Sequence, residues 1–142
     1  MEDWDFNRRR LTRDESVALL ARPLTGVFST VHAAGWIHSV PVHFLFAEGE
    51  IRVVAEAGAV KSRNAARSGQ ATLCVDLTEE TVRSYVSVSG PVSIRRTLPA
   101  PDLLALDLKY GRTDYAAGFD DYPDAVMLVL RAERWIAWAD WD

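Results

Sequence analysis

The sequence is poor in cysteine and in long apolar runs. A single cysteine, Cys74, excludes an intramolecular disulfide and a zinc site built from several thiolates. We therefore expect a protein of the reducing cytoplasm. No apolar run approaches the roughly 20 residues that a membrane-spanning helix needs. Residues 1–13 are charged and lack the apolar core of a secretion signal, so we expect neither a leader peptide nor a membrane partner.

An excess of basic residues is also missing. The 142 residues include 16 Lys and Arg against 20 Asp and Glu, which gives a formal net charge of −4. This balance argues against a nucleic-acid-binding protein. Only two of the basic residues are lysines, Lys61 and Lys109. Such a preference for arginine is typical of a high-GC genome, and it makes each lysine worth inspecting.

The remaining composition is that of one globular domain. Hydrophobic residues make up 49% and charged residues 25% of the chain, which is ordinary for a folded domain. We expect residues 1–142 to form a single domain. Within it, residues 1–10 are mostly polar, and we expect them to form a flexible, solvated arm.

Helix signals occur at three places. Thr12 and Glu15 fit a capping box, and the helix that they begin is predicted to end at Pro23. A second helix is expected over residues 59–67 and a third over 102–110, each closely followed by a glycine that can end it.

Strand signals dominate the rest of the chain. β-Branched and aromatic residues mark seven predicted strands, at 25–32, 36–46, 51–56, 71–76, 85–95, 125–131 and 134–141. Short loops join the first three in an antiparallel meander, and Pro41 indicates a sheet edge or a bulge. Residues 78–83 and 112–124 are expected to be polar connections. The pattern predicts a small, mostly antiparallel barrel with peripheral helices.

Several catalytic motifs are absent. The sequence has no Gly-x-Ser-x-Gly nucleophile elbow, no Walker A loop and no dinucleotide-binding glycine fingerprint. His38 and His43 are five residues apart on one predicted strand, so they point to opposite faces and no shared metal site is expected. Cys74 alternates with Leu73 and Val75, and we interpret it as a small buried residue rather than a nucleophile.

The segment 57–64 carries the strongest chemical signal. A predicted strand ends, Gly58 turns the chain, and a helix begins with Lys61 and Arg63 in its first turn. The helix dipole disfavours cations at this end. A bound phosphate would reverse that penalty, because the free N–H groups and the side chains of Lys61 and Ser62 all favour an anion. The competing interpretation is a turn that only water contacts.

Five segments together resemble the flavin/deazaflavin oxidoreductase superfamily, which has the split β-barrel of pyridoxamine 5′-phosphate oxidase. They are 26–31, 35–44, 60–67, 71–75 and 85–92, and their order and spacing match over about half of the chain. The resemblance implies a mainly β (α+β) fold, namely a six- to seven-stranded antiparallel split β-barrel with peripheral short helices. It also implies a homodimer with two cofactor sites at the subunit interface.

The resemblance further implies a set of cofactor-binding residues. On two strands, at one helix start and on the last strand, these are Ser29, Thr30, Val31, Val40, Pro41, Val42, Lys61, Ser62, Arg63, Asn64 and Trp138. The first strand matches the one beside the cofactor ring, and the second matches the one that lines the ring and the tail. Lys61 matches the lysine that contacts the cofactor phosphate. Trp138 or Trp135 is a candidate to close the site from the other subunit.

The function implied by the resemblance is a coenzyme F420-dependent or FMN-dependent oxidoreductase that transfers hydride to an unsaturated organic small molecule. F420, a 5-deazaflavin, is favoured over FMN because the arginine-rich composition is typical of high-GC actinobacteria. Gly58, Ala59 and Val60 depart from this pattern, since deazaflavin-binding members often have basic or hydroxyl residues just before the lysine. This departure keeps loss of cofactor binding open.

Two alternatives use the same fold. One is a non-catalytic protein that binds a flavin, a deazaflavin or haem. The other is a pyridoxamine-phosphate oxidase proper, but that enzyme is usually longer, and its extra basic substrate-binding segment is not found in this sequence. The substrate stays open, and so does the source of any acid/base group, which could be His38, His43, Tyr115 or solvent.

Overall fold

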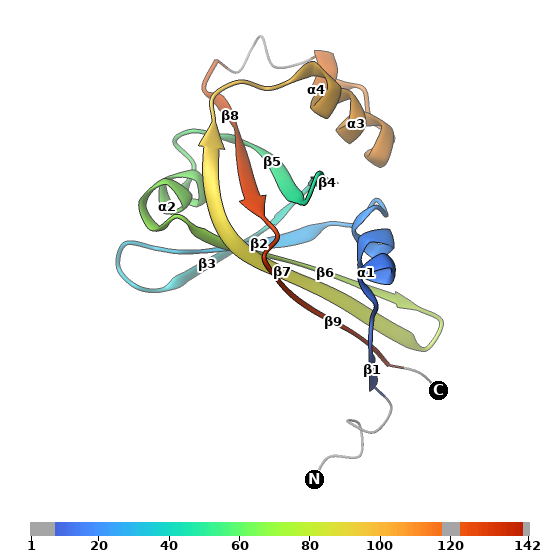
Figure 1. Ribbon diagram of the computed structural model, residues 1–142. Helices are drawn as coiled ribbons and strands as arrows, with labels where there is room; N and C mark the ends of the chain where they lie inside the picture. The colour runs from blue at the N-terminus through green and yellow to red at the C-terminus, as the bar shows by residue number, and fades with distance from the viewer. Residues whose placement is uncertain (1–7, 118–122, 141–142) are drawn as a thin grey trace.

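The computed structural model describes residues 8–117 and 123–140 (Figure 1). Within them, nine strands and four helices follow one another. In chain order these are β1 (Arg8–Arg10), α1 (Arg13–Leu20), β2 (Gly26–Val31), β3 (Ile37–Val42), β4 (Leu45–Ala47), β5 (Glu50–Glu56), α2 (Val60–Ser68), β6 (Gln70–Glu79), β7 (Val82–Arg95), α3 (Ala100–Tyr110), α4 (Asp114–Ala117), β8 (Ala125–Arg131) and β9 (Arg134–Asp140). None of these helices is long and apolar enough to cross a membrane.

The strands form an antiparallel split barrel, so the predicted fold is confirmed. Their order is β3-β2-β6-β7-β8-β5-β4, with β9 paired to β7 and β1 paired to β9. The long, bent strand β7 joins the two halves: its first part pairs with β6 and β9, and residues 92–95 pair with β8. Figure 1 shows this strand running from the β6–β7 hairpin to the top of the molecule.

The three predicted helices are confirmed. Thr12 and Glu15 form both hydrogen bonds of the capping box that begins α1. Gly69 and Gly111 end α2 and α3 with φ of 68° and 65°, a backbone conformation that glycine adopts without strain. A fourth helix, α4, lies inside the segment that was expected to be a polar loop.

Two strand predictions are wrong. The long strand predicted over 36–46 is divided into β3 and β4, and between them the chain crosses from the β2 side of the barrel to the β5 side. The first three predicted strands therefore do not form one meander. The expected connector 78–83 is the tight end of the β6–β7 hairpin, where Glu80 has a φ of 55°. Pro41 does lie on an edge strand, as predicted.

The predicted N-terminal arm is ordered where it is described. Arg8–Arg10 form β1 and pair with β9, instead of extending into solvent. The rest of the arm, residues 1–7, lies outside the described residues, as do residues 118–122 of the predicted loop and Trp141 at the end of the last predicted strand.

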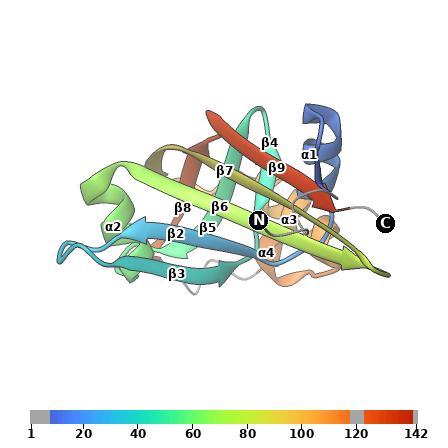
Figure 2. The same cartoon turned by 90° about the horizontal axis from the view of Figure 1, so that it is seen from below.

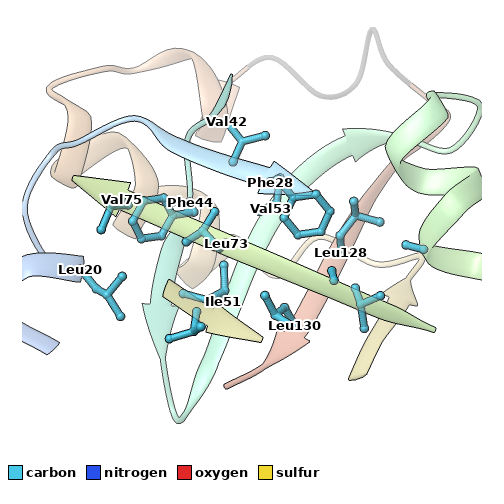
Figure 3. Close-up of a cluster of buried hydrophobic side chains, with 14 of the residues drawn as sticks. Leu20, Phe28, Val42, Phe44, Ile51, Val53, Leu73, Val75, Leu128 and Leu130 are labelled. Carbon is cyan, nitrogen blue, oxygen red and sulfur yellow. The ribbon is translucent and has the colours of Figure 1, made fainter. Parts of the chain in front are cut away.

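The hydrophobic core fills the space between the two halves of the barrel (Figure 3). Its fully buried side chains come from α1 and from most of the strands, and they include Leu20, Phe28, Phe44, Ile51, Leu73, Leu128 and Leu130. Each such side chain contributes about 1.5–3 kcal/mol by leaving water. This packing gives a rigid frame for the groups that line the surface pockets beside α2.

Candidate functional site

Two adjoining pockets make one groove beside the start of α2. The first has a volume of about 370 Å³ and is lined by Val54, Ala55, Glu56, Ala59, Lys61, Tyr115 and Ala125. The second has about 410 Å³ and is lined by Thr25, Pro41, Val42, His43, Val54, Lys61 and Tyr115. Because the two linings share Val54, Lys61 and Tyr115, we treat them as one site, the α2 groove. Each pocket falls within the size range of small-molecule sites.

Helix α2 meets this groove with an uncapped N-terminus. The N-cap residue Ala59 makes no side-chain hydrogen bond, and the first turn holds no acidic residue. The first N–H groups of a helix have no partner within it, and they carry the positive end of the dipole. Lys61 adds a full positive charge in this turn, whereas Glu56 on the same lining opposes it. The donor set at the start of α2, Lys61 and the free N–H groups, fits a phosphate.

Two polar side chains of the first turn serve the fold. Ser62 is fully buried, and its hydroxyl donates to the carbonyl oxygen of Glu56 at 2.6 Å. Asn64 is buried too, and its amide donates to the hydroxyl of Thr30 at 3.1 Å. These bonds fix the start of α2 against β5 and β2. They leave Lys61 and the helix N–H groups as the donors at the groove.

The arginines of α2 take different positions. Arg63 is exposed, one turn or less from the groove-lining lysine. Arg67 donates to the carbonyl oxygen of Val31 and so ties the helix to the end of β2. Arg63 lines neither pocket of the groove.

The predicted β2 residues line a different pocket. Ser29, Thr30 and Val31 surround a hollow of about 170 Å³, together with Arg134 of β9. The hydroxyls of Ser29 and Ser39 are 2.8 Å apart, so they are hydrogen-bonded to each other. Within one copy of the chain, the structure does not bring these residues into the α2 groove.

The remaining predicted residues divide between groove and core. Pro41 and Val42 line the α2 groove, whereas Val40 packs against the hydrophobic core; contact of these residues with a cofactor stays a prediction. Trp138 lies on β9, where the guanidinium of Arg10 is 4.9 Å from its ring centroid, and it lines neither pocket of the groove. Its role in a partner's site stays a prediction.

The groove contains a histidine–tyrosine pair. Nδ1 of His43 is 3.1 Å from the hydroxyl of Tyr115, and the imidazole stacks on Tyr110 with ring centroids 3.9 Å apart. Burial, followed by the charge of Arg112, lowers the pKa of His43 below 6.5, so the ring is neutral at pH 7. Burial raises the pKa of Tyr115 above 10, so its phenol keeps the proton.

Residues of α3 hold this pair in place. The buried carboxylate of Asp107 accepts the backbone N–H groups of Tyr115 and Ala116 at 3.0 and 2.9 Å, and so begins α4. The hydroxyl of Tyr110 donates to the carbonyl oxygen of Leu24 at 2.9 Å. Sequence reasoning missed both Asp107 and Tyr110, because no local motif indicates that α3 reaches back to this groove.

Other chemical candidates lie elsewhere. His38 is beside Trp36, with ring centroids 5.9 Å apart, and does not line the groove. Cys74 is half-buried rather than fully buried, and burial raises the pKa of its thiol. Among residues 8–117 and 123–140, no group of three or more His, Cys, Asp or Glu side chains is arranged to hold a metal ion.

Comparisons with known proteins agree with this architecture. The family model described as pyridoxamine 5′-phosphate oxidase matches residues 12–139. The conserved hypothetical protein Rv2991 of Mycobacterium tuberculosis superposes with a TM-score of 0.79 at 18% identity, covering 90% of this chain and 84% of that one. An F420 reductase gives 0.70 at 24% identity, covering 83% and 93% of the two chains. The heme storage protein HutZ of Vibrio cholerae gives 0.71 at 16% identity, covering 91% and 96%. No curated protein sequence matches.

Proposed function

Because this chain belongs to the pyridoxamine 5′-phosphate oxidase family, we propose that it is a reductase whose redox cofactor binds with its phosphate in the α2 groove. The cofactor is coenzyme F420, with FMN as the alternative, and the substrate is an unsaturated organic small molecule. The observation that carries the proposal is Lys61, which lines the groove at the uncapped start of a helix.

The lining of the groove suits both ends of such a cofactor. Lys61 and the N–H groups of α2 favour the phosphate. Val54, Ala55 and Ala125 form an apolar wall next to them, which favours a flat ring. When bound, a reduced flavin or deazaflavin supplies the hydride, and the protein supplies binding and orientation. This division of labour needs no nucleophilic side chain.

The preference for F420 rests on charge. Its tail carries more negative charge than that of FMN, and exposed Arg63 follows Lys61 on the same helix. A structural neighbour of this chain is an F420 reductase. The absence of basic or hydroxyl side chains at positions 58–60 weighs the other way, which is why FMN is kept as the alternative.

A non-catalytic binding protein is the second candidate, because one structural neighbour is a heme storage protein. The neutral imidazole of His43 is the histidine ring in the groove that would ligate haem iron. On this alternative, added haem gives a Soret band that His43→Ala removes, and no reduction of an organic substrate is detected.

We also propose that the protein is a homodimer. Figure 2 shows the sheet formed by β3, β2, β6, β7 and β9, and the strand register places four exposed apolar side chains on one face of it. Val27, Val31, Ile37 and Ile136 are 43%, 42%, 69% and 55% exposed. A second copy of the chain would cover them. It would also add groups to the pocket at Ser29, which lies on this face.

Cofactor titration tests the proposal. Purified protein is titrated with F420 and with FMN while the fluorescence of each is followed, and one of them is expected to bind with a Kd below about 50 μM. Lys61→Ala is expected to weaken binding by about tenfold or more, because a charge-assisted hydrogen bond contributes about 1.5–3 kcal/mol. Arg83→Ala, an exposed cation on β7, is the control. If neither cofactor binds, or if Lys61→Ala matches the parent protein, the proposal fails.

A further inference from the structure

We propose that His43 and Tyr115 form a proton relay that donates to the oxygen of a conjugated carbonyl substrate, such as an enone, an enal or a quinone. The inference rests on the proposed function, since it names the substrate class of the same groove. It selects two residues from the four acid/base sources that the sequence left open.

His43 and Tyr115 both line the α2 groove, and Nδ1 of His43 is 3.1 Å from the hydroxyl oxygen of Tyr115. In the part of the chain that the structure describes, Nε2 of His43 has no hydrogen-bond partner. The atom is also not one of the fully buried polar atoms. This nitrogen is therefore open to a molecule in the groove.

The hydrogen bond between the two side chains determines which nitrogen of His43 carries the proton. A protonated phenol that donates to Nδ1 leaves the proton of a neutral imidazole on Nε2. The charged groups around His43 maintain the neutral ring, since Arg112 and Lys109 disfavour an imidazolium and outweigh the opposing charge of Asp114. Both members of the pair are thus neutral donors, which suits a substrate that gains negative charge only during the reaction.

Neighbouring residues hold His43 and Tyr115 in place. Asp107 holds the backbone of Tyr115, and Tyr110 stacks on the ring of His43 at 9° between planes. The guanidinium of Arg112 is 5.4 Å from the ring centroid of Tyr115, where it stabilises a tyrosinate. Donors that are positioned in advance do not have to be organised at the moment of reaction.

The chemistry balances as follows. A bound reduced cofactor would supply the hydride for a C–H bond at the β carbon of the enone, and the electron pair of the C=C bond would move through the conjugated system to the carbonyl oxygen. That oxygen takes the proton from Nε2 of His43, while Nδ1 takes the proton of the Tyr115 hydroxyl. Tyr115 regains a proton from water, and the enol becomes the saturated ketone. The substrate is reduced by two electrons, and the cofactor is oxidised by two.

One test does not need a cofactor. Ring ¹⁵N NMR of the cofactor-free protein at pH 7 is expected to show His43 as a neutral imidazole with its proton on Nε2. Tyr115→Phe removes the donor to Nδ1, so its spectrum is expected to show a mixture of both tautomers. A charged ring, or a proton on Nδ1 in the parent protein, would overturn the relay.

The second test measures turnover of 2-cyclohexen-1-one with the reduced cofactor. Tyr115→Phe and His43→Gln are expected to lower kcat about 10²–10⁴-fold, the usual contribution of general acid catalysis, while the Kd of the cofactor changes less than about twofold. His38→Gln and Tyr85→Phe are matched controls outside the groove and keep the parent rate. Parent-like rates in both groove variants would overturn the relay.

The two readouts separate the relay from the proposed function. If the parent protein binds neither cofactor, the proposed function fails, and the NMR result still decides whether the His43–Tyr115 pair has the protonation that the relay needs. If cofactor binds and the groove variants keep the parent rate, the proposed function stands and the relay fails. Thermal unfolding of each variant identifies a loss of rate that comes from loss of folding, and Tyr115→Phe, which removes one oxygen atom, is then the deciding variant.

Discussion

At the scale of single residues, both lysines occupy special positions. Lys61 is partly exposed in the α2 groove. Lys109 of α3 is half-buried, and its ammonium group donates to the carbonyl oxygens of Leu20 and Phe44 at 2.8 Å each. The same group is 3.6 Å from the ring centroid of Phe44. Lys109 thus ties α3 to the end of α1 and to the break between β3 and β4.

The buried amine of Lys109 makes stability depend on pH. Burial lowers the pKa of Lys109 from 10.5 to about 8. Between these two values the unfolded chain binds more protons at this site than the folded chain, so the contribution of Lys109 to the free energy of unfolding rises with pH. We expect the free energy of unfolding of the parent, minus that of Lys109→Met, to rise from pH 8 to 10.5, as measured by urea unfolding. A difference that stays flat across this window would contradict the burial of the charge.

Gly90 of β7 is predicted to be the glycine most sensitive to substitution. A Cβ at this position would overlap the backbone carbonyl of Arg131, where the β8–β9 connection approaches β7. We expect Gly90→Ala to lower the free energy of unfolding by about 3 kcal/mol or more. Gly58→Ala, where no atom lies within 4 Å of the added Cβ, is the control and should change stability by less than about 0.5 kcal/mol. Equal effects would show that the close approach is absent.

At the scale of elements, a buried ion network attaches α3 to the barrel. Arg52 of β5 is 7% exposed. It donates to Asp102 at the start of α3 at 3.0 Å and to Glu50 at 2.9 Å. Glu50 also accepts from Arg95 of β7 at 3.0 Å. Because α3 carries the residues that support the His43–Tyr115 pair, this network helps to position the groove from a distance.

Removing the central cation of this network should be costly. We expect Arg52→Leu to lower the free energy of unfolding by about 3–5 kcal/mol, because it leaves the buried carboxylate of Asp102 without its cation. Arg22→Leu removes an exposed ion pair with Glu79 and should cost less than about 1 kcal/mol. Chemical denaturation of both variants measures the contrast. A cost for Arg52→Leu as small as that for Arg22→Leu would contradict the buried network.

Elements set by local chemistry were predictable from the sequence. A capping box and two terminal glycines act within a few residues, so the start of α1 and the glycines that end α2 and α3 were predicted correctly. The end of α1 was predicted less well, since the helix ends at Leu20 and not at Pro23. The helix start at Lys61 was identified from the same kind of local signal. The break after β3 was not predictable, because the backbone N–H of Phe44 bonds to the hydroxyl of Tyr110 at 3.1 Å, 66 residues away. The His43–Tyr115 contact spans 72 residues and depends on the placement of α3, which no local pattern shows.

At the scale of the whole molecule, residues 8–117 and 123–140 leave one broad face of the split barrel's sheet uncovered. The face carries exposed apolar side chains and the pocket lined by Ser29, Thr30 and Val31. These three residues were predicted to lie beside the cofactor ring, yet a single copy keeps them out of the α2 groove. A homodimer in which this face is buried would bring groups of the second copy to the pocket at Ser29.

The dimer has a direct test. Ile136→Glu puts a charge on this face, where Ile136 is 55% exposed. It is expected to raise the dimer dissociation constant about 100-fold or more, because a buried unpaired charge costs several kcal/mol. Leu108→Glu, at a side chain of α3 that is 78% exposed and lies off this face, is the control. Sedimentation velocity should show the parent and Leu108→Glu as dimers and Ile136→Glu as a 15.8 kDa monomer. A monomeric parent would contradict the dimer.

Lys61 is proposed to hold the phosphate of the cofactor, and a comparison of ligands with and without that phosphate tests this role most directly. The Kd is measured for F420 and for its phosphate-free deazaflavin ring compound, or for FMN and riboflavin, in the parent and in Lys61→Ala. We expect the parent to prefer the phosphate-bearing form by about tenfold or more. We also expect Lys61→Ala to lose most of this preference while its affinity for the phosphate-free form is unchanged. An undiminished preference in Lys61→Ala, or an equal loss of affinity for both forms, would contradict it.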